Sequence, residues 1–257
     1  MLEDELKKLG FKNTIEGVLL SKRVIEILNS LNVCPPNSVF GYSTCRDEIN
    51  RTVTDFKTYF NGQEFPHGWL AGYPGSGITG FNAYSHHCPD AEEKNLVIFY
   101  GPHVGVKEGG KIGKVLRRGQ KHDSPSCGAA IQFLQRCRKA AMEGGEYTPQ
   151  FTHEDDIEQH TIEKELSNHA RYILYDENSR MLPEDEQIRR LVESNYVVVD
   201  EAMLKRIEEI KDSFKGGIVL IGGVMINADY PKPQYVDLRR FEIHRNNKIE
   251  NLMKRLE

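Results

Sequence analysis

The sequence has few cysteines, no long hydrophobic run and no excess of positive charge. Five cysteines in 257 residues are too sparse for a disulfide scaffold, which leaves thiols, metal ligands or small buried side chains as their roles. No apolar run approaches the length that crosses a bilayer, and the acidic start at 1–6 is unlike a secretory or transit peptide. We therefore expect a cytoplasmic protein without a membrane partner. A net charge of −4 gives no basic excess for binding nucleic acid.

Length and composition favour one domain that spans residues 1–257. A chain of this length, with 39% hydrophobic residues, can bury one substantial core. Periodic apolar residues predict a leading amphipathic helix, with Thr14 as its cap and Glu16 in its first turn, which ends before Cys34. We expect a leading helical segment at about 1–33 and a core at about 38–227.

Three apolar runs, at 38–43, 95–100 and 217–226, predict buried β-strands. Helical patterns lie between these runs. Alternating strands and helices predict an α/β fold, with a mainly parallel β-sheet flanked by helices. In such sheets, ligands bind outside the carboxyl ends of the strands.

The other segments carry weaker patterns. A helix that begins near Cys45 is predicted from an apolar stripe: Ile49, Val53, Phe56 and Phe60. The charged second half of the chain predicts helices at 154–172, 184–193 and 202–214, a short strand at 196–199, and a solvated or partner-facing helix at 248–257.

Three potential metal ligands follow predicted strands or begin a predicted helix. Cys45 and His103 each come just after a strand, and Cys127 stands in the first turn of a helix that Ser126 caps. Two thiolates and one imidazole suit Zn²⁺ and leave a fourth position open, as in catalytic zinc sites. The spacing matches no short zinc motif, so two buried cysteines and a capping histidine remain the alternative.

Two other motifs are weaker. Residues 86–90, His-His-Cys-Pro-Asp, offer several ligand types, but neighbouring side chains in extended structure point to different sides, so only one of His86 and His87 can face a given site. The glycine-rich segment 72–80 lacks the Lys-Ser/Thr ending of a phosphate-binding loop and is better interpreted as a tight loop. Cys34, Cys88 and Cys137 are interpreted as structural.

The stretch after Cys45 adds a carboxylate and a guanidinium. In the predicted helix, Asp47 and Arg51 stand at positions i and i+4, where they can form a charge-assisted pair. Alone, this pair would be an ordinary surface ion pair. Beside a metal ligand it gains a chemical role.

Taken together, four motifs resemble the low-CO2-inducible LCIB-type family, which is similar in fold to the β-carbonic anhydrases and is also described as theta-type. The motifs lie in order between residues 39 and 134: Cys45-x-Asp47-x-x-x-Arg51, Gly80-Phe81 with His86-His87-x-Pro89-Asp90, Gly101-Pro102-His103-Val104-Gly105, and Cys127-Gly128-Ala129. The resemblance implies that Cys45, His103 and Cys127 bind zinc, with Asp47 and Arg51 as the catalytic dyad.

The resemblance also implies an activity. The protein would be a carbonic anhydrase, a zinc lyase that hydrates CO2 reversibly to bicarbonate through a zinc-bound hydroxide. Asp47 would orient this hydroxide, while Arg51 would hold Asp47 ionised. A small, mostly apolar CO2 pocket would include Phe81, one of His86 and His87, Val104 and Gly128.

Two further expectations come from the same resemblance. One is a homodimer with the site near the subunit interface. The other is an alternative function, in which the chain is a catalytically silent, zinc-containing protein that binds inorganic carbon or a partner.

Overall fold

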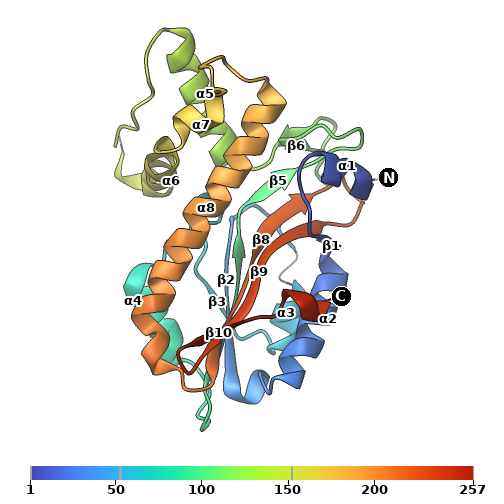
Figure 1. The fold of residues 1–257 in the computed structure, drawn as a ribbon, viewed down its shortest axis with the longest axis vertical. Coiled ribbons are helices and arrows are strands. Elements are labelled where there is room, and N and C mark those ends of the chain that lie inside the picture. The colour runs from blue at the N-terminus through green and yellow to red at the C-terminus, as the bar shows by residue number, and fades with distance from the viewer. Residues whose placement is uncertain (1, 52–53, 152, 257) are drawn as a thin grey trace.

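The computed structural model describes residues 2–51, 54–151 and 153–256, and within these ranges one mixed β-sheet organises the chain (Figure 1). Its strand order is β1-β9-β8-β4-β2-β3, with β5 also paired to β8 and β10 paired to β9. The strands of this sheet are β1 Thr14–Glu16, β2 Ser38–Thr44, β3 Glu64–Pro66, β4 Asn95–Gly101, β5 His103–Gly105, β8 Gly217–Asn227, β9 Tyr235–Arg245 and β10 Lys248–Asn251. A separate small hairpin joins β6 Lys114–Val115 to β7 Ser124–Pro125.

Helices cover both faces of the sheet. The α-helices are α1 Leu2–Lys8, α2 Gly17–Ser30, α3 Thr54–Tyr59, α4 Gly77–His86, α5 Gly128–Met142, α6 Ile157–Ser167, α7 Ala170–Leu174 and α8 Glu184–Ile210. Short 3-10 turns lie at Pro35–Asn37, Leu70–Gly72, Glu154–Asp156, Lys211–Ser213 and Met253–Leu256. In Figure 1 the long α8 crosses one face diagonally, and α5, α6 and α7 gather around its amino-terminal half. None of the helices in the described ranges is both long and apolar enough to cross a membrane.

The central strands are parallel, as the sequence predicts. β2 pairs in parallel with β3 and β4, and β4 pairs in parallel with β8. The other side of the sheet is antiparallel, because β9 runs against β1, β8 and β10. The predicted α/β architecture with a mainly parallel sheet is therefore confirmed, and the antiparallel edge is an addition to it.

Alternation along the central strands supplies two hydrophobic layers. Phe40, Val97 and Phe99 face α2 and α3, while Val39 and Ile98 pack with α4 and α8. β4 is buried along its whole length. A strand that is buried on both faces favours apolar residues at successive positions, which is why residues 96–100 form a continuous apolar run.

A break between β4 and β5 places His103. Gly101 has φ +148°, and a Cβ atom at this position would lie 1.7 Å from the carbonyl oxygen of Gly223. Beyond Pro102 the chain pairs with β8 again, with His103 opposite Met225. The absence of a side chain at Gly101 thus lets the chain pass close to β8 and carry His103 beyond the end of β4.

Several local predictions were wrong. Thr14 and Glu16 belong to strand β1, where they pair with β9, and helix α2 begins only at Gly17. No helix begins near Cys45, since the next helix, α3, begins at Thr54; Ile49 lies before it, and Val53 lies outside the described residues.

The second half of the chain holds two more differences. The predicted strand at 196–199 is part of α8, which runs unbroken for 27 residues. The tail is not a solvated helix: its first residues form β10, and Leu252 and Leu256 are buried against the sheet. In both places long-range packing overrides the local pattern.

Candidate metal centre

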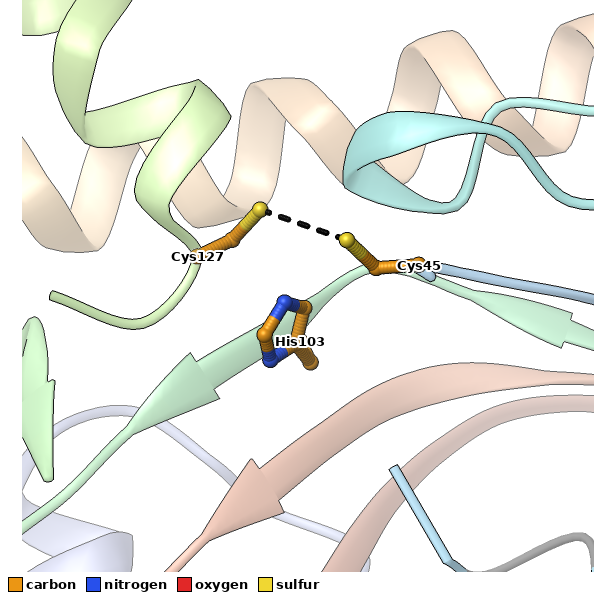
Figure 2. Close-up of side chains that lie close together, drawn as sticks. All are labelled: Cys45, His103 and Cys127. Carbon is orange, nitrogen blue, oxygen red and sulfur yellow. Dashed lines mark hydrogen bonds between the residues drawn. The ribbon is translucent and has the colours of Figure 1, made fainter. Parts of the chain in front are cut away.

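Cys45, His103 and Cys127 meet at the carboxyl ends of the parallel strands. Cys45 directly follows β2, His103 begins β5, and Cys127 is the N-cap of α5 rather than a residue of its first turn. Their three ligand atoms lie within 4.8 Å of one another, and all three residues are buried (Figure 2). Side chains that are far apart in the sequence thus form one cluster, as we predict from their positions at strand ends.

The spacing of this cluster fits a metal ion. The two Sγ atoms are 3.7 Å apart, too far for a disulfide. Two sulfurs that each lie about 2.3 Å from one tetrahedral zinc ion are separated by about 3.8 Å. The distance between Cys45 and Cys127 therefore matches a shared zinc ion.

His103 offers one nitrogen to the cluster. Its Nδ1 lies 2.7 Å from Oδ1 of Asn227 and 3.1 Å from Oγ of Ser126. Its Nε2 is buried and has no hydrogen-bond partner among the described residues. A buried ring nitrogen without a partner is costly in a protein interior, and a metal ion would remove that cost.

The two thiols differ in their readiness to lose a proton. The hydrogen bond between the two sulfurs lowers the pKa of Cys127, and backbone amides at the start of α5 act in the same direction. The same hydrogen bond raises the pKa of Cys45, and burial raises it further. The amide of Ala71 also donates to Sγ of Cys45 at 3.2 Å, so negative charge on this sulfur already has a partner.

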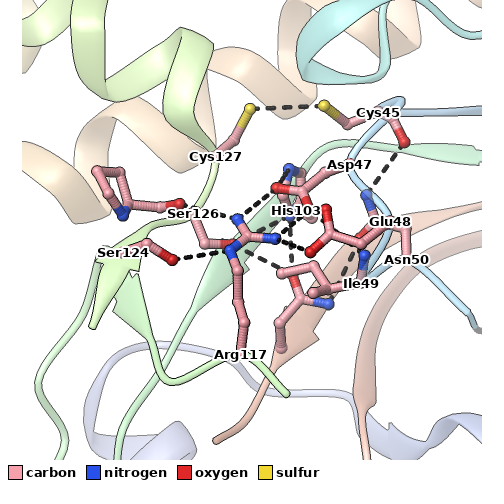
Figure 3. A network of polar contacts seen from close by, with 12 residues as sticks. Cys45, Asp47, Glu48, Ile49, Asn50, His103, Arg117, Ser124, Ser126 and Cys127 are labelled. Carbon is pink, nitrogen blue, oxygen red and sulfur yellow. Dashed lines mark hydrogen bonds and ion pairs between the residues drawn. The ribbon is translucent and has the colours of Figure 1, made fainter. Parts of the chain in front are cut away.

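Asp47 borders the cluster, but its cationic partner is Arg117 (Figure 3). The guanidinium of Arg117 binds both carboxylate oxygens, at 2.5 Å and 2.8 Å. The predicted pair with Arg51 is absent, because the helix that would align the two residues does not form; Arg51 is exposed, and its backbone amide donates to Gln234. Burial alone would raise the pKa of Asp47, but Arg117 and the nearby His103 lower it below its ordinary value.

Arg117 is a functional candidate that the sequence analysis missed. It lies between β6 and β7, 70 positions from Asp47 in the chain. Its Nε donates to Oγ of Ser124 and its Nη2 to the carbonyl of Pro125, which fixes the guanidinium from its own hairpin. Nothing local singles it out from its neighbour Arg118, so only the fold reveals its role.

A polar cavity of about 340 Å³ lies beside the cluster. Its lining residues are Tyr42, Thr44, Cys45, Arg46, Asp47, Asn50, Lys57, Pro66 and Gly68. None of the residues predicted to form an apolar CO2 pocket lines it. Val104 packs in the same hydrophobic cluster as Cys45 and Cys127, and Gly128 begins α5, but Phe81 belongs to another cluster of the core.

His86 and His87 lie away from the metal ligands within one chain. Both are exposed at the end of α4, and the next residue, Cys88, contacts the carbonyl of Asn95 at the start of β4. The ring of His87 packs against Phe65 of β3, with centroids 5.5 Å apart. Neither histidine lines the polar cavity beside Cys45, so contact of one of them with the site stays a prediction.

A different histidine, His67, is buried between Pro66 and Gly68, which line the polar cavity. It follows β3, and its ring stacks on Phe81 with centroids 4.1 Å apart, while Ser76 contacts its Nδ1 at 2.6 Å. Burial, with a smaller effect from Arg206, lowers the pKa of His67 to about 3, so the ring is neutral. No sequence pattern points to His67, since a single histidine after a proline forms no motif.

Comparisons with known proteins agree with this geometry. The sequence model of one protein family, the limiting CO2-inducible proteins B/C beta carbonic anhydrases, matches residues 15–245. Among solved structures, the chain is similar to PtLCIB4, a homolog of the limiting CO2-inducible protein LCIB, with 26% identity, a TM-score of 0.82, and 96% of this chain and 98% of that chain covered. LCIB itself has the same fold, with 18% identity, a TM-score of 0.69 and 93% of each chain covered. No curated protein sequence matches significantly.

The family match spans most of the chain and includes all three potential metal ligands as well as Asp47 and Arg117. The resemblance seen in the motifs is thereby confirmed. The chain belongs to the family of limiting CO2-inducible proteins B/C beta carbonic anhydrases.

Proposed function

We propose that the protein is a zinc-dependent carbonic anhydrase that hydrates CO2 reversibly to bicarbonate. The observation that carries this proposal is the cluster of Cys45, His103 and Cys127, which offers two sulfurs and one nitrogen within 4.8 Å. These three residues would hold the ion. When bound there, zinc supplies a Lewis acid that turns water into a nucleophile near neutral pH.

Asp47 is suited to orient that water. Its Oδ2 lies 3.7 Å from Nε2 of His103, so a carboxylate oxygen faces the ligand set. This oxygen can accept a hydrogen bond and so direct a lone pair of the water toward CO2. Arg117 keeps the carboxylate ionised and holds its plane with two hydrogen bonds.

The neighbouring polar cavity suits the charged product. Arg46 and Lys57 line it together with Asp47, and Arg46 is itself paired with Glu158 at 2.8 Å. Cations near its walls favour an anion such as bicarbonate, and an open polar cavity admits water. We assign this cavity to water entry and bicarbonate release.

The test is zinc content and CO2 hydration, measured on the same sample by elemental analysis and stopped-flow with a pH indicator. We expect about one zinc per chain, and an Asp47→Asn protein that is about 100-fold slower or more. Asp90→Asn, at an exposed position at the end of the sheet remote from the ligands, is the control and should keep the parent rate. A parent rate in Asp47→Asn would contradict the proposal, and zinc-replete protein without any rate would favour the inorganic-carbon binding role.

We also propose a cytoplasmic homodimer in which the site lies near the subunit interface. The support is the family membership and the location of the polar cavity at the surface of a single chain. Light scattering coupled to size exclusion tests the oligomeric state, and a monomer at all concentrations would contradict it.

A further inference from the structure

A line of side-chain amides connects the segments that carry the three potential ligands (Figure 3). Asn227, the last residue of β8, is 1% exposed, and its Oδ1 lies 2.7 Å from Nδ1 of His103. Its Nδ2 donates to Oδ1 of Asn50 at 3.4 Å. The amide of Asn50 in turn donates to the backbone carbonyl of Cys45 at 3.1 Å.

The backbone carbonyl of Cys45 determines which atom donates in every hydrogen bond of this line. A backbone carbonyl can only accept, so the group of Asn50 that faces Cys45 must be its NH2. The oxygen of Asn50 is then the acceptor for the NH2 of Asn227. The oxygen of Asn227 is consequently the atom that faces His103, and it can only accept.

This polarity decides the tautomer of the imidazole. With an acceptor at 2.7 Å, Nδ1 of His103 carries the proton, and in the neutral ring Nε2 carries the lone pair. Nε2 is the nitrogen that has no hydrogen-bond partner in the part of the chain that the structure describes, and it lies with the two sulfurs. We propose that Asn227 is the positioning residue of the metal centre, fixing His103 in the one tautomer that can bind zinc through Nε2.

Ser126 supports the same arrangement from the third segment. Its hydroxyl lies 3.3 Å from Oδ1 of Asn227 and 3.1 Å from Nδ1 of His103, and the next residue is Cys127. Because Oδ1 of Asn227 receives the His103 proton, the hydroxyl can donate to the same oxygen. Asn227 thus connects to the segments of Cys45, His103 and Cys127 at once.

This inference rests on the metal centre of the proposed function, and its first test measures zinc affinity by competition with a chromogenic chelator. Asn227→Leu keeps the approximate volume but cannot accept, and we expect its affinity to be about 10-fold to 100-fold weaker. Asn227→Asp still accepts from Nδ1 and should bind at least as tightly as the parent. Asn95→Leu removes a buried amide at the other end of β4 and should keep the parent affinity.

A second measurement needs no variant. In protein labelled with ¹⁵N-histidine, long-range ¹H–¹⁵N spectra of the parent report which ring nitrogen of His103 carries the proton. We expect the proton on Nδ1 both without zinc and with it. A proton on Nε2 in the neutral, zinc-free ring would overturn the inference even if Asn227→Leu fails to fold.

The outcomes separate the two proposals. Zinc binding by the parent with equal affinity in Asn227→Leu overturns the positioning role and leaves the metal centre intact. A folded parent that binds no zinc overturns the metal centre and the positioning role together. Tight zinc binding with no CO2 hydration leaves the role of Asn227 standing and contradicts the proposed function.

Discussion

Arg117 binds both carboxylate oxygens of Asp47, although the two residues are 70 positions apart in the chain. Two parallel hydrogen bonds between a guanidinium and a carboxylate fix orientation as well as charge. The same guanidinium also contacts Glu48 at 2.8 Å. The carboxylate beside the metal ligands is therefore oriented by a hairpin that comes from a distant part of the sequence.

The first prediction distinguishes the two arginines. Arg117→Ala should lower the CO2 hydration rate about 10-fold to 100-fold, because Asp47 loses the partner that orients it. Arg117→Lys should recover only part of the rate, since an ammonium cannot form the two parallel hydrogen bonds. Arg51→Ala should stay near the parent rate. A larger loss in Arg51→Ala than in Arg117→Ala in stopped-flow assays would instead favour Arg51 as the partner of Asp47.

The second prediction concerns the thiols. Cys127→Ser should lose most of its zinc, because a hydroxyl is a poor substitute for a thiolate ligand. Cys137→Ser is the matched control, since Cys137 is also buried in α5 but lies outside the ligand cluster. Elemental analysis after dialysis measures both, and equal zinc contents would argue against Cys127 as a ligand.

The third prediction concerns the break between β4 and β5. Gly101→Ala should lower the free energy of unfolding by more than about 4 kcal/mol, because its Cβ would overlap the carbonyl of Gly223. Gly109→Ala is the control: its φ of +86° is also unfavourable, but the space around it is open, so we expect only about 1–2 kcal/mol. Urea unfolding gives both values, and similar losses would show that the contact at Gly101 can relax.

The fourth prediction is a pH dependence from His67. The pKa of this buried ring is lowered to about 3 in the folded protein, against an ordinary value of about 6.5. As pH falls below about 6.5 the unfolded chain gains a proton that the folded chain does not, so stability decreases down to about pH 3. His67→Phe should make this decrease in stability smaller. Urea unfolding between about pH 6.5 and about pH 3 gives the free energy of unfolding that checks it. His122→Phe, at an exposed position, is the control and should leave the decrease in stability as it is in the parent protein.

Strands and ligands were predictable where burial dictates composition. β4 and β8 are buried throughout, which requires the continuous apolar runs that mark them in the sequence. Because Cys45 follows the predicted strand that forms β2 and His103 follows the one that forms β4, their meeting at one sheet edge could be inferred from the sequence. Cys127 was selected from its place at a predicted helix start, and the family resemblance added the activity to this reasoning.

Other features depend on contacts that no local pattern contains. The β-branched run at 196–199 favours a strand, yet it lies in α8, where Val198 and Val199 pack in the core. β9 was not predicted because the buried carboxylate of Asp237 and the nearby Arg239 interrupt its apolar pattern. These two charged residues pair with each other on one face of the strand. Arg117 and Asn227 likewise gain their roles only from partners far away in sequence.

The origin of the three ligands from β2, β5 and the start of α5 has a consequence for assembly. The cluster exists only after parallel strands separated by long stretches of chain have paired, and such non-local contacts form slowly. Zinc cannot organise the early chain, as it does in small zinc-dependent domains that are unfolded without the ion. Zinc would therefore bind after the sheet has formed, and its effect would be a rise in melting temperature that grows with the concentration of free ion.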